Sequence, residues 1–327
     1  MMLVTGATGL VGNNVVRQAL EQGQLVRVLV RASSDPRPLA GLGVERVLGD
    51  VGEAESVRRA CEGARWVVHC AAHVQLGRSR LDLHRAVNVE GTRHVAQAAR
   101  AVGARMIHVS TTDALGIRTG EEPAHETTPL AEPVNCCYVI SKREAEQVVL
   151  AEAARGLDAV IVNPGYMLGP WDWKPSSGRM LLEIARGHGW FAPQGCFSVG
   201  DVRDVAAGIL AAIERGRTGQ RYILGGVTMS YLDTWRLMAE VTGARRPRRV
   251  APWWMLRLAG GAGDLCTRLT GREPDVNSGA IALARLCKDL TSRRAETELG
   301  YRIRPFRQSV EDAWHWFCDH GYAHGRS

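Results

Sequence analysis

The stretch LVTGATGLVG at residues 3–12 decides the fold of this chain. Its start predicts a short buried strand, and glycines follow that strand at a spacing of three. Gly6 permits a tight turn, Gly9 lets backbone N–H groups approach a pyrophosphate, and Gly12 lets the next helix pack closely on the strand. This strand–turn–helix context is a specific signal for a dinucleotide rather than for a plain glycine-rich turn. The residues predicted to bind a cofactor here are Gly6, Thr8, Gly9, Leu10 and Gly12.

Outward from this turn, apolar strands alternate with helices. Strands are predicted at residues 3–5, 25–30, 44–48, 66–70, 106–110, 159–162 and 221–224, and helices at 10–21, 53–61, 87–102, 138–155 and 201–214. Strands separated by helices of this length predict the α/β class, with a doubly wound parallel sheet of the Rossmann type. A dinucleotide-binding domain is expected at residues 1–164, to which 201–224 return. A smaller, mainly helical substrate-binding lobe is expected at 165–200 and 225–327.

The end of the second strand bears on the choice of cofactor. An acidic residue there would bind the ribose hydroxyls of NAD(H), but the position is Arg31, which can pair with a 2′-phosphate. We therefore expect NADP(H), with NAD(H) as the alternative and a merely solvated Arg31 as the simpler explanation. Asp50 and Val51 follow the third strand and are expected at the adenine, although an Asp at such a turn can also cap a helix.

Tyr138 and Lys142 lie four residues apart, which places them one turn apart on the same face of a helix. A phenol with a pKa of about 10 does not release its proton readily at neutral pH, and an adjacent ammonium lowers that pKa. Tyr138 is therefore predicted to exchange a proton with a substrate oxygen while Lys142 also holds the nicotinamide ribose. Thr111, at the end of the preceding strand, is predicted to hydrogen-bond the same oxygen, with Ser110 and Thr112 as alternatives.

Further motifs give the chain a family resemblance. They include HCAAH at 69–73, NVEGT at 88–92, HVSTTDALG at 108–116, YVISK at 138–142 and NPGYMLGPWDWKP at 163–175. With the glycine turn, the chain resembles the extended short-chain dehydrogenase/reductases, or NAD-dependent epimerase/dehydratase family. It is most similar to the dihydroflavonol-reductase-like and hopanoid-associated sugar epimerase-like branch, and the resemblance covers nearly the whole chain.

The resemblance implies roles for particular residues. Asn88 would steady the active-site helix, and Thr111 matches the usual catalytic Ser of the family. A dimer is implied through the helices at about 88–102 and 138–155. Other residues would lie along the cofactor, and these are Ala71, Ala72, Asn88, Ser110, Tyr138, Lys142, Pro164, Gly165 and Met167.

Three functions remain open at this point. The first is the NADP(H)-dependent reduction of an aldehyde or ketone, which Arg31 favours. The second is an NAD-dependent nucleotide-sugar epimerase or dehydratase, in which Arg179 and Arg203 could meet a diphosphate or could be plain surface. The third is a non-catalytic dinucleotide sensor. An apolar or aromatic substrate is suggested by three tryptophans that could equally form the core of the lobe, namely Trp171, Trp173 and Trp190.

Composition narrows the class of protein. The chain has 327 residues, of which 45% are hydrophobic and 23% charged, as in an ordinary soluble globular protein. The net charge of +7 includes the cluster Arg245–Arg249. We expect this cluster to be a solvated loop or to attract an anionic cofactor and substrate, and we expect no nucleic-acid partner. A small-molecule substrate and a homodimer are the expected partners.

The start of the chain enters the first strand directly, so no signal peptide is predicted. No apolar run reaches the roughly 18 residues that span a bilayer, and a cytoplasmic protein without a membrane span is expected. The best candidate for membrane contact, Val250–Leu258, is interrupted by Arg257, and we expect it to form a buried helix instead.

The eight cysteines show no metal-ligand spacing. No metal is predicted, and the cysteines are expected to be scattered reduced thiols. His73, His125 and Asn135 are expected to border the pocket without an assigned role.

Overall fold

The computed structural model describes residues 1–117, 121–130 and 135–323. Its centre is a seven-stranded sheet in the order β10-β6-β5-β4-β1-β2-β3, and all of its neighbouring strands are parallel. The strands are β1 (Met2–Thr5), β2 (Val26–Val30), β3 (Glu45–Leu48), β4 (Trp66–His69), β5 (Arg105–Val109), β6 (Ala159–Pro164) and β10 (Arg221–Leu224). The central strands are apolar and buried on both faces, as a parallel sheet between helices requires. The predicted fold class is confirmed.

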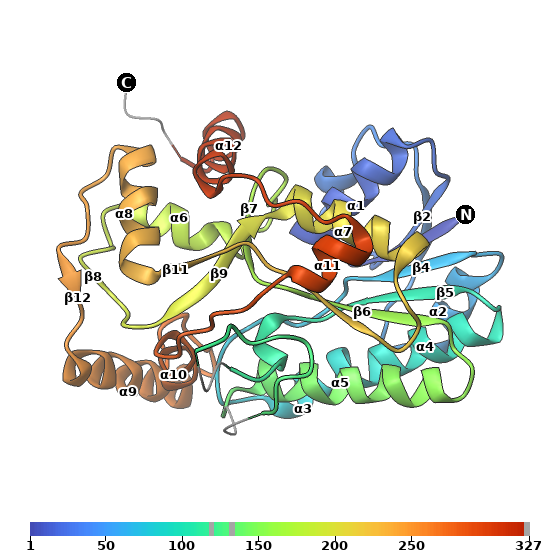
Figure 1. Cartoon of the computed structure of the whole chain (residues 1–327), viewed down its shortest axis with the longest axis horizontal. Coiled ribbons are helices and arrows are strands. Elements are labelled where there is room, and N and C mark those ends of the chain that lie inside the picture. Colours follow the sequence, from blue (N-terminus) through green and yellow to red (C-terminus); the bar gives the residue numbers. More distant parts are fainter. Residues whose placement is uncertain (118–120, 131–134, 324–327) are drawn as a thin grey trace.

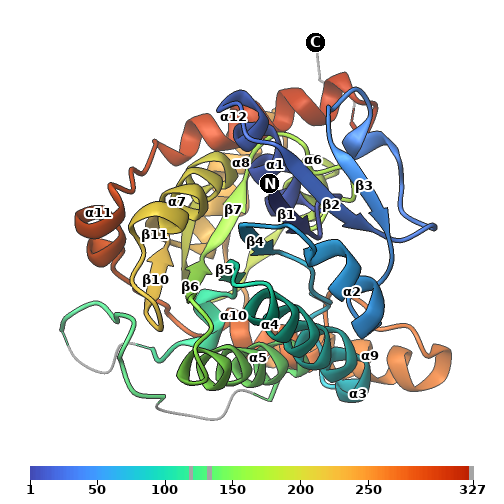
Figure 2. The same cartoon turned by 90° about the vertical axis from the view of Figure 1, so that its right-hand side faces the viewer.

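Helices cover both faces of this sheet. Figure 2 shows α1 (Leu10–Glu21) and α7 (Val202–Arg215) on one side of it, and α2 (Ala54–Cys61), α4 (Gly91–Ala101) and α5 (Cys137–Ala154) on the other. A π-helical turn, Arg85–Glu90, joins the short α3 (Leu81–His84) to α4, so the predicted helix at 87–102 begins with irregular backbone.

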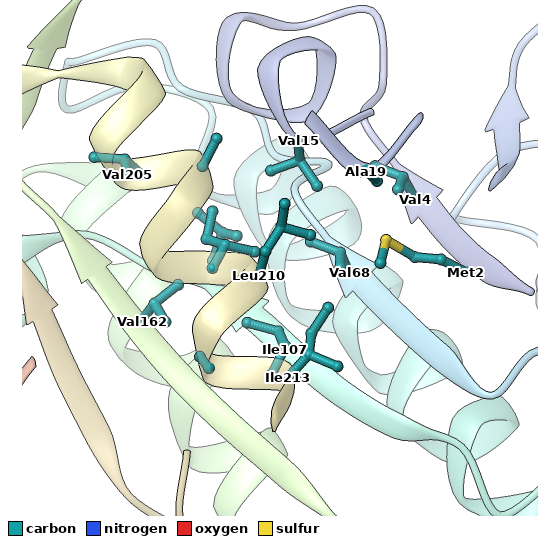
Figure 3. Close-up of a cluster of buried hydrophobic side chains, with 14 of the residues drawn as sticks. Met2, Val4, Val15, Ala19, Val68, Ile107, Val162, Val205, Leu210 and Ile213 are labelled. Atoms are coloured by element: carbon teal, nitrogen blue, oxygen red, sulfur yellow. The ribbon is translucent and has the colours of Figure 1, made fainter. Parts of the chain in front are cut away.

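Each face of the sheet has its own apolar core. Alternate strand residues such as Val4 and Ile107 pack against Val15 of α1 and Leu210 of α7, as Figure 3 shows. The opposite face packs against α2, α4 and α5. Because successive side chains of a strand point to opposite faces, one short apolar strand serves both cores.

The rest of the chain forms a lobe at the carboxyl ends of these strands. It contains α6 (Gly178–Ala185), α8 (Tyr231–Thr242), α9 (Trp253–Thr270), α10 (Ser278–Ala284) and α12 (Phe306–Asp319) (Figure 1). Its strands are β7 (Tyr166–Leu168), β8 (Phe191–Ala192), β9 (Cys196–Asp201), β11 (Val227–Ser230) and β12 (Arg249–Val250). They form a three-stranded sheet, β11-β9-β7, and a two-stranded one, β12-β8. The helix α11 (Arg293–Leu299) instead packs on α7 and β10, where Ala295 and Leu299 join the apolar core between the seven-stranded sheet and α7.

Two expectations from the sequence are wrong. Cys196 and Cys287 form a disulfide rather than two reduced thiols, because β9 and the segment after α10 run side by side there. The stretch that includes Val250–Leu258 is not a buried helix, since most of α9 is exposed. Its inward face consists of glycines, which leaves its large side chains outside.

Two features are absent from the described residues. No helix among them is both long and apolar enough to cross a membrane. No group of three or more His, Cys, Asp or Glu side chains in the same part of the chain is arranged to hold a metal ion.

Candidate active site

The glycine turn between β1 and α1 fits a pyrophosphate. Gly6 has a φ of +70°, and a Cβ there would lie 2.6 Å from the backbone nitrogen of Ala71. A Cβ at Gly12 would lie 2.3 Å from the carbonyl oxygen of Gly6, so only glycine allows this approach of helix to turn. Gly9 is exposed, no described side chain caps α1, and the first turn of α1 contains no acid. Backbone N–H groups at this helix end are therefore available to an anion.

Other residues predicted to bind the cofactor surround this turn. Thr8 is half-buried in the turn itself, and Leu10 is the buried first residue of α1. Ala71 and Ala72 follow β4 and are half-buried. The backbone N–H of Ala71 donates to the hydroxyl of Thr5 at 3.4 Å, which ties this loop to the end of β1.

Arg31 and Asp50 lie next to each other beyond the ends of β2 and β3. Arg31 Nη1 is 3.9 Å from Asp50 Oδ2, and the Arg31 side chain is 66% exposed. Asp50 accepts a hydrogen bond from the N–H of Gly52 at 2.8 Å, which stabilises its own turn. Val51 beside it is buried, and its carbonyl oxygen lies 3.0 Å from Nδ1 of His94 on α4. The guanidinium of Arg31 is thus accessible to a ligand that reaches this edge.

Thr111 follows β5, Tyr138 lies in the first turn of α5, and the Thr111 side chain is close enough to lower the pKa of Tyr138. Thr111 is buried, and its Oγ1 also accepts from the N–H of Asp113 at 3.2 Å. Burial raises the pKa of Tyr138, the charge of Asp113 raises it further, and the Thr111 side chain lowers it. The protein by itself therefore keeps this phenol protonated at neutral pH, as a proton donor requires.

Lys142 lies one turn further along α5 and is fully buried. Its ammonium donates to the carbonyl oxygen of Val109, at the end of β5, at 2.7 Å. Burial lowers the pKa of Lys142 to about 8, although Glu146 and Cys70 raise it. The sequence led us to expect that this ammonium lowers the pKa of Tyr138. Without a bound cofactor, the pKa of Tyr138 is instead raised, by burial and by the charge of Asp113.

A buried carboxylate that the sequence reasoning missed lies behind these residues. Glu146 accepts from Ser110 Oγ at 2.5 Å, from Asn163 Nδ2 at 2.7 Å and from Arg221 Nε at 2.7 Å. This hydrogen bond occupies the hydroxyl of Ser110. The side chain of Thr111 acts on Tyr138, and Thr112 lines the pocket described below. The spacing of four residues between Lys142 and Glu146 was the available signal, because it places both on one helix face.

Asn88 connects the active-site helix to the loop after β4. Its Nδ2 donates to Ser141 Oγ at 2.9 Å and to the carbonyl oxygen of His73 at 3.0 Å. Its Oδ1 accepts from the N–H of His73 at 2.7 Å. These contacts hold α5 at the residue before Lys142 while they fix the loop that carries Ala72.

Asp113 forms an ion pair with Lys288, a second pairing that the sequence reasoning missed. Lys288 is buried and comes from the segment after α10, so the lobe contributes the charge that pairs with Asp113, the carboxylate that acts on Tyr138. No local pattern links two residues 175 positions apart. A pocket of about 360 Å³ opens here. Its lining includes Thr112, Asp113 and Asn135 together with the basic side chains of Arg78, Arg143, Arg285 and Lys288.

The segment after β6 passes close to the lobe. Pro164 ends β6 and is buried, and a Cβ at Gly165 would lie 2.7 Å from the carbonyl oxygen of Ser198. Met167 lies half-buried in β7. All three lie at or just after the carboxyl end of β6, the strand next to β5, at the edge where Thr111 also lies.

The three bordering residues predicted without a role differ in position. The ring of His73 is half-buried and packs edge-on against the ring of His84, with 4.5 Å between ring centroids. Asn135 lines the pocket, and its carbonyl oxygen accepts from Arg78 Nε at 3.3 Å. His125 is exposed and hydrogen-bonds within its own loop.

The sequence left open whether three tryptophans contact a substrate or form the core of the lobe, and they do not all lie together. Trp171 and Trp173 pack with Trp316 in the core of the lobe. Trp190 is 62% exposed and lies under the guanidinium of Arg245.

The two arginines considered for a diphosphate are both held in ion pairs. Arg179 pairs with Asp275 at 2.6 Å, and Arg203 pairs with Asp201 at 2.7 Å and with Asp312 at 2.6 Å.

The chain resembles known proteins over almost its full length. Residues 2–225 match the family described as "NAD dependent epimerase/dehydratase family". The chain is 36% identical over 328 residues to a "Putative dihydroflavonol 4-reductase" of Synechocystis sp., covering 98% of this chain and 95% of that one. It is 37% identical to "Sterol demethylase protein B" of Methylococcus capsulatus, with 98% of both chains covered.

Solved structures agree with this assignment. The crystal structure of gox2253 superposes with a TM-score of 0.86 at 36% identity, over 98% of each chain. A nucleoside-diphosphate-sugar epimerase of Pseudomonas aeruginosa superposes with a TM-score of 0.81 at 26% identity, also over 98% of each chain. The chain therefore belongs to the NAD-dependent epimerase/dehydratase family of extended short-chain dehydrogenase/reductases, and it is an NAD(P)-dependent oxidoreductase.

Proposed function

We propose that this oxidoreductase reduces an aldehyde or ketone with NADP(H). The observation that carries the proposal is the proximity of the Thr111 and Tyr138 side chains, with buried Lys142 one turn away from Tyr138 on the same helix. Two hydroxyl groups then face one substrate oxygen, one from the segment after β5 and one from α5. The relatives named as a dihydroflavonol 4-reductase and a ketoreductase of Stigmatella aurantiaca support carbonyl reduction.

The bound dinucleotide supplies the hydride that forms the new C–H bond at the carbonyl carbon. Thr111 donates a hydrogen bond to the carbonyl oxygen and orients it. Tyr138, whose raised pKa keeps it protonated, gives its proton to that oxygen as the alkoxide develops. Lys142 would hold the nicotinamide ribose with its ammonium, and that charge lowers the cost of the phenolate that remains. Reversal of these steps oxidises the alcohol.

The choice of NADP(H) rests on Arg31. Its guanidinium is exposed beyond the carboxyl end of β2, where the ribose of the adenosine half lies in a Rossmann domain. Asp50, 3.9 Å away, partly neutralises the guanidinium and holds it at this edge. An arginine binds a phosphate with charge-assisted, often bidentate hydrogen bonds, which NAD(H) does not offer at this position.

The second candidate is a nucleotide-sugar epimerase or dehydratase that retains NAD⁺. The basic side chains that line the pocket favour it, because Arg78, Arg143 and Arg285 could meet a diphosphate. The ion pairs of Arg179 and Arg203 count against the alternative diphosphate site considered from the sequence.

The experiment that separates the two is denaturation of the purified protein, followed by mass spectrometry of any released dinucleotide. A reductase exchanges its cofactor at every turnover, so we expect little retained dinucleotide, tighter binding of NADPH than of NADH, and consumption of NADPH with a panel of carbonyl compounds. Stoichiometric NAD⁺ in the released fraction, with no NADPH consumption, would instead support the epimerase or dehydratase.

Two further parts of the assignment are proposals. We propose a homodimer through α4 and α5, to be checked by the mass of the protein in light scattering. We also propose that residues 165–200 and 225–327 bind the substrate while 1–164 and 201–224 bind the cofactor. In that division the residues Ala295 and Leu299 stabilise the cofactor domain although they belong to the lobe segment.

A further inference from the structure

The helix α9 has its small side chains inside and its large ones outside. It packs on α10 and on the segment before it through Gly260 and Gly263, the buried residues of α9. A Cβ at Gly263 would lie 1.9 Å from the carbonyl oxygen of Val276, and one at Gly260 would lie 3.0 Å from Ile281. A helix that served only to close the lobe would bury its leucines on this side.

The opposite side of α9 is a continuous apolar stripe. Trp254, Leu258, Leu265 and Leu269 are 64%, 66%, 55% and 77% exposed. At 3.6 residues per turn these four positions fall within roughly 60° of one another around the helix. Exposed apolar residues scattered singly need no explanation, but a contiguous stripe of large ones marks an interaction surface.

This apolar stripe lies in the most basic stretch of the chain. Residues 245–272 contain seven arginines, no lysine, and Asp264 as the single acid. The carboxylate of Asp264 is occupied by the N–H of Ser278 at 3.0 Å. Arg257 and Arg268 are exposed on α9 beside the stripe, and the cluster Arg245–Arg249 leads into the helix. Of the cluster, Arg246 pairs with Glu240.

A second pocket lies against α9 and next to the pocket of the candidate active site. It has a volume of about 290 Å³ and lies between α9 and α10, where Leu256 and Ile281 line it. Its lining shares Arg78, Ala282 and Arg285 with the pocket beside Asp113. Figure 1 shows α9 and α10 together at the end of the molecule away from the N-terminus.

We propose that α9 docks the protein on an anionic lipid surface. The helix lies in the plane of the interface, with Trp254, Leu258, Leu265 and Leu269 among the acyl chains and the arginines at the phosphate headgroups. A second copy of this chain is the less suitable occupant, because pairing of α9 with itself would bring two such arginine-rich stretches together. This inference goes beyond the proposed function, because membrane binding by α9 does not depend on the reaction that the protein catalyses and can be measured without a substrate.

The test is co-sedimentation of the whole protein with vesicles of phosphatidylcholine alone or with added phosphatidylglycerol. We expect binding to the anionic vesicles, weakened by salt, and much weaker binding to the neutral ones. Replacing Leu265→Gln and Leu269→Gln together should weaken binding at least tenfold. Replacing Arg257→Gln and Arg268→Gln should weaken it roughly fivefold for each charge removed, and only on anionic vesicles.

The matched control is Leu25→Gln with Leu48→Gln, which removes two leucines that are 70% and 63% exposed in the dinucleotide domain. This variant should bind vesicles like the unchanged protein, and all variants should keep their dinucleotide affinity. Two results would overturn the proposal. One is a lack of binding to anionic vesicles, or binding that the α9 variants do not change. The other is an oligomer in light scattering that Leu265→Gln with Leu269→Gln dissociates, which would make a second copy the occupant.

Discussion

At the scale of single residues, the proposed chemistry depends on one proton. Tyr138→Phe removes the hydroxyl that meets Thr111 and leaves the aromatic ring, so the fold and the glycine turn stay intact. We expect turnover to fall by about 10²–10⁴, the usual contribution of a positioned proton donor, while the affinity for dinucleotide stays the same. Steady-state kinetics and a binding titration measure the two quantities. Tyr322→Phe, in the lobe, is the control, and undiminished turnover of Tyr138→Phe would contradict the assignment.

The lowered pKa of Lys142 leads to a prediction about how the stability of the protein depends on pH. Its pKa is about 8 in the folded protein and about 10.4 when exposed, so the unfolded chain binds more protons between these values. The contribution of Lys142 to stability should therefore rise as pH increases from about 8 to about 10.4. Tyrosines and cysteines titrate in the same range, so the quantity to measure is the difference in unfolding free energy between the unchanged protein and Lys142→Met. A difference that is independent of pH across this range would contradict the lowered pKa.

Arg31 makes a prediction about cofactor choice. Arg31→Asp replaces a group that can pair with a 2′-phosphate by one that can accept from ribose hydroxyls. The loss of a charged hydrogen bond is worth about 10- to 100-fold, so the ratio of kcat/KM for NADPH over NADH should fall by at least that factor. Arg59→Asp, an exposed charge reversal on α2, controls for the change in net charge. An unchanged ratio in Arg31→Asp would show that another residue selects the cofactor.

At the scale of elements, the turn between β1 and α1 contains one glycine that the fold requires and one that only ligand binding requires. A Cβ at Gly9 would lie 3.4 Å from the carbonyl oxygen of Gly6, an ordinary contact, whereas one at Gly12 would lie 2.3 Å from the same atom. Gly9→Ala should therefore keep the Tm and weaken NADPH binding, because the new methyl group takes up space in the exposed turn that we propose holds the pyrophosphate. Gly12→Ala should lower the unfolding free energy by roughly 1–3 kcal/mol and weaken binding as well. Thermal melts with and without NADPH distinguish the two, and equal Tm losses would contradict this reading of the turn.

Elements of this kind were predictable because their signals are local. The glycine spacing, the apolar strands and the Tyr138–Lys142 pair each lie within a few residues, and the strand and helix bounds agree with the structure to within a few positions. The exposure of α9 was not predictable from apolar content, since Val250–Leu258 alone resembles a core segment. The glycines at 260 and 263, which let the helix pack by its small face, lie outside that stretch.

At the scale of the whole molecule, the missed features join segments far apart in the chain. The Asp113–Lys288 ion pair and the Cys196–Cys287 disulfide have no spacing motif, because the return of the chain after α10 creates both. The same return places Lys288 against Asp113, whose charge acts on Tyr138, and it places the disulfide beside Lys288. The position of this segment should therefore affect both stability and the substrate pocket.

Removal of the disulfide would test whether the segment after α10 affects both the stability of the protein and the pocket. It closes a loop of 91 residues, and constraining the unfolded chain to this extent stabilises a protein by roughly 4–5 kcal/mol at most. Cys287→Ser should lower the unfolding free energy under oxidising conditions by up to this amount, and a reductant should lower that of the unchanged protein to match. Cys266→Ser removes an exposed free thiol on α9, so it should leave the unfolding free energy unchanged, and a reductant should still lower that of the variant. Because Cys287 precedes Lys288, its loss should also raise the KM for the carbonyl substrate more than it lowers kcat. A variant that is less stable but has an unchanged KM would mean that the segment supports the fold without shaping the pocket.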